Sequence, residues 1–293
     1  MKPPIFVIGN PRSGTTLLRL MLTSHRNIVI PPECGFTVWF YNKYGDWEES
    51  DIHARLSSFL DDLLDARKFE LWKLDRMDLH EFIQHKSPDS YPQLVSCVYE
   101  LYGLSQGRTF TRWGDKNNFH VHHIPTIRAM FPTAFFVHIA RDGRDVACSY
   151  KKLAEQQFDT VYAPRLPHQI EDIAQQWKEN IQAITSSFDR IGWQDVCEVR
   201  FEDLIEETEA TLRNLCDRLG EEFDPSMLEY YVWNRERELE PAETLLWKRK
   251  NLEPPIGAEV GRYTDELTGE EVDVFQRIAR QELMHYGYLV GEP

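Results

Sequence analysis

Short runs of apolar residues alternate along this chain with longer segments whose apolar residues recur at helical spacing. Three apolar runs, at 5–8, 134–140 and 196–201, predict buried β-strands. The segments 169–190 and 206–219 predict helices. Because buried strands that alternate with helices are typical of a parallel sheet, the pattern predicts an α/β fold, with a central parallel sheet and helices on both faces.

A long helical region follows the first strand. The stretch 46–82 has apolar residues at helical spacing, and the turn-like segment 86–92 comes after it. This region predicts a helical insertion, at about 40–110, that lies over the sheet. The apolar positions that carry the spacing are Leu56, Phe59, Leu60, Leu63 and Leu64.

The last helix is marked by its caps. Thr268 and Glu271 have the spacing of a capping box, and Gly287 follows the end of the apolar pattern. We find no internal repeat, low-complexity tract or Gly/Ser linker in the 293 residues. The chain is therefore predicted to form a single domain, 1–293, although its length alone would also allow two.

A glycine-bearing loop joins the first strand to a helix whose apolar spacing begins at Leu17. A strand, a loop and a helix N-terminus in this order form an anion cradle, because free backbone N–H groups and the helix dipole point at one spot. The alternative is an ordinary strand-to-helix turn. The loop reads Gly9-Asn10-Pro11-Arg12-Ser13-Gly14-Thr15-Thr16.

The loop almost matches the phosphate-binding pattern G-x-x-x-x-G-K-[ST], with Gly9 and Gly14 in register. The lysine position, however, holds Thr15. Arg12 instead offers a planar fork suited to bidentate contact with a tetrahedral oxyanion. The predicted ligand is therefore phosphate-like, but not ATP with magnesium.

Composition narrows the classes of function. A net charge of -15 argues against binding of nucleic acid or a polyanionic glycan over a broad surface. Basic residues nevertheless gather near the motifs. The run 248–250 is interpreted equally well as a member of this basic group and as a solvated patch of charge. Five scattered cysteines without C-x-x-C spacing indicate reduced thiols. With no signal peptide or long apolar stretch, we expect a cytoplasmic protein without a membrane anchor.

The loop resembles the 5′-phosphosulfate loop of the sulfotransferases that use 3′-phosphoadenosine-5′-phosphosulfate (PAPS). A second signature of that family is an arginine at the end of a strand, followed eight residues later by a serine. Here Arg141 ends an apolar run, and Ser149 lies on a helix opened by Asp142 and Gly143. An ion pair of Arg141 and Asp142 at the helix start is the alternative. The resemblance is strong over about 4–36 and 112–153, moderate over 196–204 and 254–288, and absent over 40–110.

The resemblance implies a set of ligands for PAPS. The 5′-phosphosulfate would be held by Arg12, Ser13, Gly14, Thr15 and Thr16. Arg141 and Ser149 would hold the 3′-phosphate. Phe201, in a segment similar to the family's Tyr-Glu-Asp-Leu-like turn, would stack on or wall the adenine, although a core aromatic is as plausible. Residues 260–263 are similar to the family's Gly-x-x-Trp-like segment near the C-terminus, and Arg262 stands at a basic position of it. Ile256-Gly257-Ala258 stands where cytosolic members have an Arg-Lys-Gly run.

Sulfuryl transfer is an in-line displacement that needs a general base and a cation near the leaving oxygen, without a required metal. Glu33 follows the second apolar strand, at 28–30, where tyrosylprotein and heparan O-sulfotransferases have a similar glutamate base. A surface glutamate is the alternative. Lys116 matches a lysine that assists the leaving group in the tyrosylprotein enzymes. The histidine base of small-molecule members is replaced by Asn118, which favours Glu33 as the base.

A histidine cluster follows this segment, and it comprises His120, His122 and His123. His120 remains the alternative base. The H-x-H-H spacing has no partnered cysteine or acidic motif, so ordinary polar histidines are favoured over metal ligands.

The sequence thus predicts a sulfotransferase that moves the sulfuryl group of PAPS to a hydroxyl, or an amine, of an acceptor. The acceptor would be a small molecule, a carbohydrate or a peptide, and no nucleic acid is expected to bind. Two alternatives are a P-loop kinase for nucleotides or small molecules and a non-catalytic nucleotide-binding protein.

Overall fold

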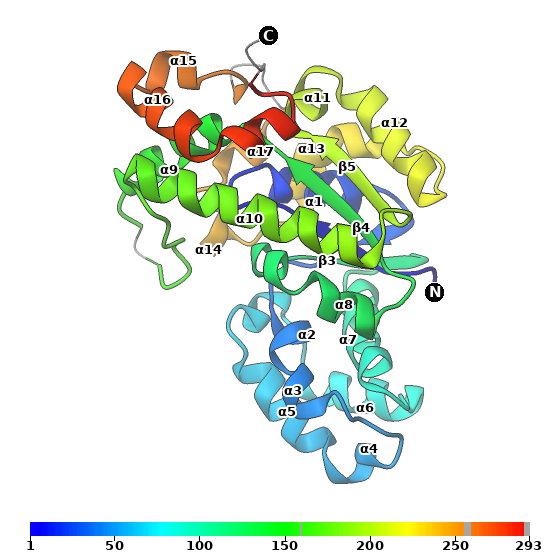
Figure 1. The fold of residues 1–293 in the computed structure, drawn as a ribbon. Coiled ribbons are helices and arrows are strands. Elements are labelled where there is room, and N and C mark those ends of the chain that lie inside the picture. The colour runs from blue at the N-terminus through cyan, green and yellow to red at the C-terminus, as the bar shows by residue number, and fades with distance from the viewer. Residues whose placement is uncertain (159, 255–258, 290–293) are drawn as a thin grey trace.

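A parallel sheet forms the centre of the molecule (Figure 1). In this computed structural model, which describes residues 1–158, 160–254 and 259–289, the sheet has five strands in the order β2-β3-β1-β4-β5. β1 lies in the middle, where Ile5 is paired with Gly114 on one side and with Phe135 on the other. The strands are β1 (Ile5–Ile8), β2 (Ile28–Val29), β3 (Arg112–Lys116), β4 (Phe135–Ala140) and β5 (Val196–Arg200).

Helices and short 3₁₀ turns connect these strands. The α-helices are α1 (Thr15–Ser24), α2 (Phe36–Trp39), α3 (Tyr41–Tyr44), α4 (Asp51–Ala54), α5 (Leu56–Asp65), α6 (Arg76–Lys86), α7 (Tyr91–Ser105), α8 (Ile124–Met130), α9 (Gly143–Ala154), α10 (Ile170–Ile191), α11 (Phe201–Glu206), α12 (Thr208–Leu219), α13 (Tyr230–Arg237), α14 (Ala242–Leu245), α15 (Tyr263–Glu266), α16 (Gly269–Ile278) and α17 (Arg280–His285). The 3₁₀ turns are η1 (Phe69–Trp72), η2 (Asn118–His122), η3 (Pro225–Glu229) and η4 (Arg249–Leu252).

The predicted α/β fold is confirmed, and the apolar runs at 5–8, 134–140 and 196–201 become β1, β4 and β5. One strand was not predicted. β3 has the polar sequence Arg-Trp-Gly-Asp-Lys, yet all five of its residues are buried. Its backbone pairs with β2 on one edge and with β1 on the other, so tertiary pairing outweighs the weak strand preference of these residues.

Alternate residues of the strands point to opposite faces of the sheet, and each face has its own helices. Phe6 and Ile8 of β1 pack on the face that α7, α8 and the end of α10 cover. Ile5 and Val7 pack on the other face, against α1, α12 and α13. The helices on both faces were expected from the near-continuous apolar character of β1 and β4.

The region between β2 and β3 is helical and projects from the sheet as a lobe (Figure 1). It does not form one continuous helix over 46–82. Lys68 and Lys73 adopt positive φ angles of 72° and 54°, and helical structure breaks at both positions. The lobe shares a core with the sheet, since Tyr99 of α7 stacks on Trp113 of β3 at 4.2 Å between ring centroids.

The predicted capping box of the last helical region is present at the start of α16. Thr268 accepts from the backbone N–H of Glu271, whose side chain reaches back to the backbone N–H of Thr268. The helix is shorter than predicted, because it breaks at Ala279 before α17. Gly287 follows α17 with a φ of 71°. Within the described ranges, no helix is long and apolar enough to cross a membrane.

Candidate active site

The loop between β1 and α1 makes a tight turn that directs the N-terminus of α1 into a cavity. Arg12 and Gly14 both have positive φ, at 69° and 94°, and the Ser13 N–H donates to the carbonyl oxygen of Asn10 at 3.1 Å. A Cβ atom at Gly14 would lie 2.5 Å from the Phe201 ring, so a side chain does not fit there. Phe201 thus supports the loop from below, and α1 presents its free N–H groups to the cavity.

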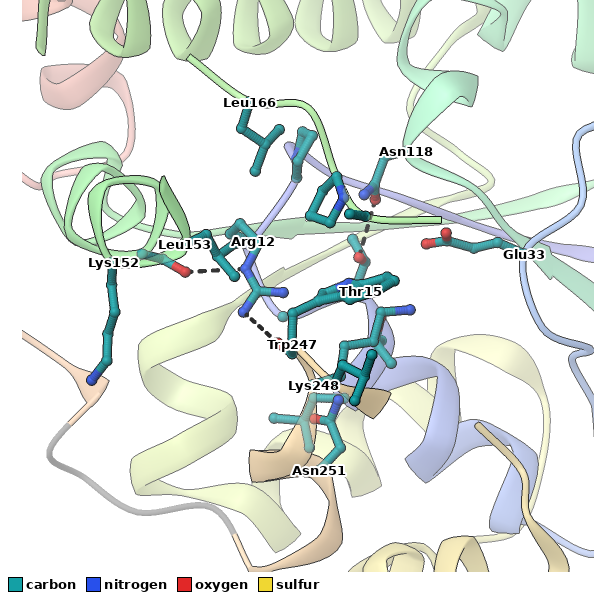
Figure 2. Close-up of a pocket in the computed structure, with 18 of the residues that line it drawn as sticks. Arg12, Thr15, Glu33, Asn118, Lys152, Leu153, Leu166, Trp247, Lys248 and Asn251 are labelled. Carbon is teal, nitrogen blue, oxygen red and sulfur yellow. Dashed lines mark hydrogen bonds between the residues drawn. The ribbon is translucent and has the colours of Figure 1, made fainter. Parts of the chain in front are cut away.

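The two predicted PAPS signatures meet at Arg12. Its Nε donates to the Ser149 hydroxyl at 3.0 Å, and its Nη2 donates to the carbonyl oxygen of Trp247 at 3.3 Å (Figure 2). Arg141 donates to the carbonyl oxygen of Arg12 at 3.1 Å, and its guanidinium lies 4.1 Å from the centroid of the Phe201 ring. Residues that are 129 positions apart are therefore in direct contact.

Asp142 does not pair with Arg141 as the alternative interpretation of this segment required. Its side chain accepts from the backbone N–H of Arg144 and caps α9, and it also pairs with the Arg144 guanidinium at 2.7 Å. Arg141 turns instead toward the loop, where the carbonyl oxygen of Glu259 is its second acceptor at 2.6 Å.

Positive charge is concentrated at this end of the cavity. Burial, together with the charge of Arg141, lowers the pKa of Arg12 to about 10. Burial also lowers the pKa of Arg141. At Arg262 burial acts in the same direction, but the hydrogen bond that its guanidinium donates to Glu266 and the charge of Glu259 raise its pKa. An anionic ligand would stabilise Arg12 and Arg141 in their charged forms.

A second charged group lies at the N-terminus of α1. The ammonium group of Lys116, at the end of β3, donates to the Thr16 hydroxyl at 3.1 Å and pairs with the Glu33 carboxylate. The other oxygen of Glu33 is 2.7 Å from the ammonium group of Lys68. A cation from the neighbouring strand thus lies close to the helix start, where the loop itself has Thr15 in place of a lysine.

The pKa values of this pair are set by the groups around them. Burial would raise the pKa of Glu33, but Lys116, Lys248 and Lys68 together bring it well below its ordinary value. Burial lowers the pKa of Lys116, and although the charge of Glu33 opposes this shift, the pKa is about 8. Three ammonium groups face the Glu33 carboxylate, so their charges outweigh the effect of burial on its pKa. Lys116 contacts one carboxylate and has a second ammonium group nearby, so the effect of burial on its pKa prevails.

These groups surround a cavity of about 920 Å³. Nine of the eleven predicted site residues line it, while Ser13 and Lys116 lie directly behind its wall. The wall also contains residues that were not predicted as site residues, among them Lys68 of the helical lobe, and Trp247 and Lys248 of the segment after α14. The predicted residues on the wall are Arg12, Gly14, Thr15, Thr16, Glu33, Arg141, Ser149, Phe201 and Arg262.

The sequence offered a weak signal for Lys248 and none for Lys68. Lys248 belongs to the basic run 248–250, for which a solvated patch was equally plausible; it is in fact 8% exposed and lies in the cavity wall. The side chains of the other two members are outside the described structure. The same holds for Ile256-Gly257-Ala258, so the structure does not bear on the prediction made for that segment.

Asn118 and His120, both in the segment after β3, lie in different surroundings. Asn118 lies on the cavity wall and its side-chain oxygen accepts from the Thr15 hydroxyl at 3.2 Å. His120 is fully buried, with Nε2 2.8 Å from Oδ2 of Asp115, and packs edge-on against Phe6. Among the described residues no group of three or more His, Cys, Asp or Glu is arranged to hold a metal ion.

The fold and the site define an α/β protein in which a helix N-terminus, a partly buried carboxylate and neighbouring cations lie around one cavity. The chain belongs to the sulfotransferase family, which residues 3–225 match. It is 23% identical over 231 residues to protein-tyrosine sulfotransferase A of Caenorhabditis elegans, covering 78% of this chain and 52% of that protein. It is 20% identical over 229 residues to a putative protein-tyrosine sulfotransferase of Caenorhabditis briggsae, covering 78% and 69%. The chain thus spans about half the length of the first of these relatives.

Two solved structures share the fold over nearly their whole length. The sulfotransferase domain from the curacin biosynthetic pathway superimposes with a TM-score of 0.60 at 18% identity, covering 96% of this chain and 98% of that domain. The sulfotransferase domain from the Synechococcus PCC 7002 olefin synthase gives a TM-score of 0.61 at 20% identity, with 95% and 96% covered. At these identities the similarity describes the fold.

Proposed function

We propose that this protein transfers the sulfuryl group of PAPS to a hydroxyl, or an amine, of an acceptor, with Glu33 as the general base. The contact of Lys116 with both Thr16 and Glu33 is the observation that carries the proposal. It brings a base, a cation and an anion cradle to one point, and in-line transfer of an anionic group needs these three parts.

The cavity has unpaired polar groups that suit a nucleotide with two anionic ends. The Ser13 hydroxyl and Nε of Arg141 are buried and lack a hydrogen-bond partner in the protein. Arg12, Ser13 and the N–H groups of Gly14, Thr15 and Thr16 would hold the 5′-phosphosulfate. Arg141 and Ser149 would hold the 3′-phosphate, with Arg262 nearby and Phe201 beneath the loop as a wall for the adenine.

In this proposal the bound nucleotide supplies an activated sulfuryl group and a bisphosphate leaving group. Glu33 accepts the proton of the acceptor at a carboxylate oxygen. While Lys116 contacts Glu33, the carboxylate is a weak base, because its pKa is well below the ordinary value. A second anion beside Thr16 competes for the Lys116 ammonium, and each weakening of the ion pair makes Glu33 more basic.

The acceptor is a small molecule, a carbohydrate or a peptide. Two relatives are named as protein-tyrosine sulfotransferases, so tyrosine peptides are the first acceptors to assay. The position of Asn118 on the cavity wall and the complete burial of His120 support the choice of Glu33 over a histidine base.

We expect adenosine 3′,5′-bisphosphate to stabilise the protein in the absence of magnesium. A ligand that binds the native state alone adds about 2.7 kcal/mol at a hundredfold excess over its dissociation constant. Thermal unfolding with the bisphosphate, and separately with magnesium and ATP, measures the preference. Equal or greater stabilisation by magnesium-ATP would favour a P-loop kinase and contradict the proposal.

Replacement of Arg141 by alanine is expected to abolish most of the preference for adenosine 3′,5′-bisphosphate over adenosine 5′-monophosphate. The guanidinium would supply the contact that distinguishes the two, and a charge-assisted hydrogen bond is worth about 1.5–3 kcal/mol. Calorimetry with both nucleotides checks this, and Arg213→Ala, which removes an exposed arginine, is the control. A preference that persists in Arg141→Ala would exclude Arg141 as the 3′-phosphate ligand.

A further inference from the structure

A buried carboxylate lies behind the site and holds two cations. One oxygen of Glu240 is 2.6 Å from Nη2 of Arg19, and the other is 2.5 Å from the ammonium group of Lys248. The Thr244 hydroxyl also donates to Glu240, at 2.6 Å. Burial would raise the pKa of Glu240, but Lys248 and Arg19 lower it to about 2. Glu240 is therefore a permanent negative charge that anchors both cations.

The segment that carries Lys248 is also attached to the anion-binding loop. The carbonyl oxygen of Trp247 accepts from Arg12, and the Trp247 ring packs edge-on against Phe158 with 5.6 Å between centroids. The Lys248 N–H donates to the carbonyl oxygen of Leu245 at 2.9 Å. Figure 2 shows Trp247 and Lys248 in the same cavity as Thr15 and Glu33. Backbone and side chain thus both fix Lys248 at the cavity wall.

The charges around Glu33 do not balance. The ion pairs there join four cations to two carboxylates, so the cluster has an excess of two positive charges. Burial of uncompensated charge is costly, and apolar residues of the same volume would serve stability as well or better. Such a cluster is suited to a bound anion. Its members are Arg19, Lys68, Lys116, Lys248, Glu33 and Glu240.

We propose that Lys248 binds the sulfuryl group of the donor, and that Glu240 is a positioning residue that holds its ammonium group at the cavity wall. This inference rests on the proposed function. Arg12 and Arg141 lie at the loop and serve the phosphates, and Lys116 lies at Thr16. Lys248 reaches the same cavity from the C-terminal segment, and so supplies positive charge for the oxygens of the group in transfer.

The test compares two ligands that differ by the sulfuryl group. In Lys248→Met, PAPS affinity without acceptor is expected to fall by about 10–100-fold, the equivalent of one charge-assisted hydrogen bond. Affinity for adenosine 3′,5′-bisphosphate is expected to stay within about threefold of the wild type, since that ligand lacks the group. Calorimetry measures both. Lys73→Met, which removes an exposed lysine from a surface ion pair, is the matched control.

Further variants separate binding from folding. Lys248→Arg keeps the charge and is expected to recover most of the PAPS affinity. Lys248→Met leaves one oxygen of the Glu240 carboxylate without its cation. The double variant Glu240→Gln/Lys248→Met removes this unpaired charge, and it is used in place of Lys248→Met if the single variant unfolds. Equal losses for PAPS and the bisphosphate, or no loss for either, would overturn the role of Lys248. A wild-type protein that binds neither nucleotide would contradict the proposed function itself.

Discussion

Glu33→Gln is expected to lower turnover by about 10²–10⁴-fold, the range for loss of a general base. Glutamine keeps the shape and one hydrogen-bond acceptor of the side chain but accepts no proton. Affinity for adenosine 3′,5′-bisphosphate should barely change, because the acceptor proton takes no part in nucleotide binding. Turnover with any working acceptor, together with calorimetry, measures the two effects separately.

The control for Glu33→Gln is Glu209→Gln, which removes a carboxylate from an exposed ion pair on α12. If Glu33→Gln retains near-full turnover while His120→Ala loses it, the base assignment is wrong. His120 is buried and hydrogen-bonded to Asp115, so its variant also needs a thermal unfolding measurement to separate loss of fold from loss of chemistry. Full activity in both variants would show that the acceptor needs neither group.

Lys116→Ala is expected to lower turnover by about 10²–10³-fold, the cost of removing one preorganised donor from a site of developing charge. Unlike Glu33→Gln, it should also weaken PAPS binding, because the ammonium group lies beside Thr16 of the anion loop. The Lys43→Met variant, which removes an exposed ammonium group, is the control. Unchanged PAPS affinity in Lys116→Ala would place Lys116 outside the ligand site.

The same residue predicts a pH dependence. The pKa of Lys116 is about 8, so its positive charge is present below that pH and is lost as the pH rises through it. The value of kcat/KM, which reports groups of the free enzyme, should therefore fall above about pH 8. Lys116→Arg should move this decline to higher pH, since a guanidinium keeps its proton there. An identical alkaline decline in Lys116→Arg would assign it to another group.

Much of the sheet could be predicted because buried parallel strands consist of apolar residues. β1 and β4 have this character, and both were predicted from the pattern of the chain. β3 does not, because Asp115 and Lys116 point polar groups at His120 and Glu33 instead of packing in an apolar layer. A strand with polar residues can be predicted only when the partners of those residues are known. Here the partners lie in η2 and in the segment after β2.

The backbone geometry of the loop between β1 and α1 could be predicted for a different reason. A strand, a turn with glycine and a helix N-terminus are consecutive, so local backbone geometry alone determines where the N–H groups point. Arg12 and Gly14 have the positive φ angles that such a turn requires. The prediction of the helical insertion over 46–82 was less exact, because apolar spacing does not show where Lys68 and Lys73 break the helices.

The tertiary structure decided which residues from distant segments come together at Glu33. Lys68 lies in the helical lobe and Lys248 after α14, and both approach Glu33 only because their elements pack around the end of the sheet. The sequence by itself determined the α/β fold and the strand, turn and helix start around the loop at 9–16, since these depend on local pattern. The charge balance at Glu33 depends on burial and on groups far apart in the chain. Long-range packing therefore decided it.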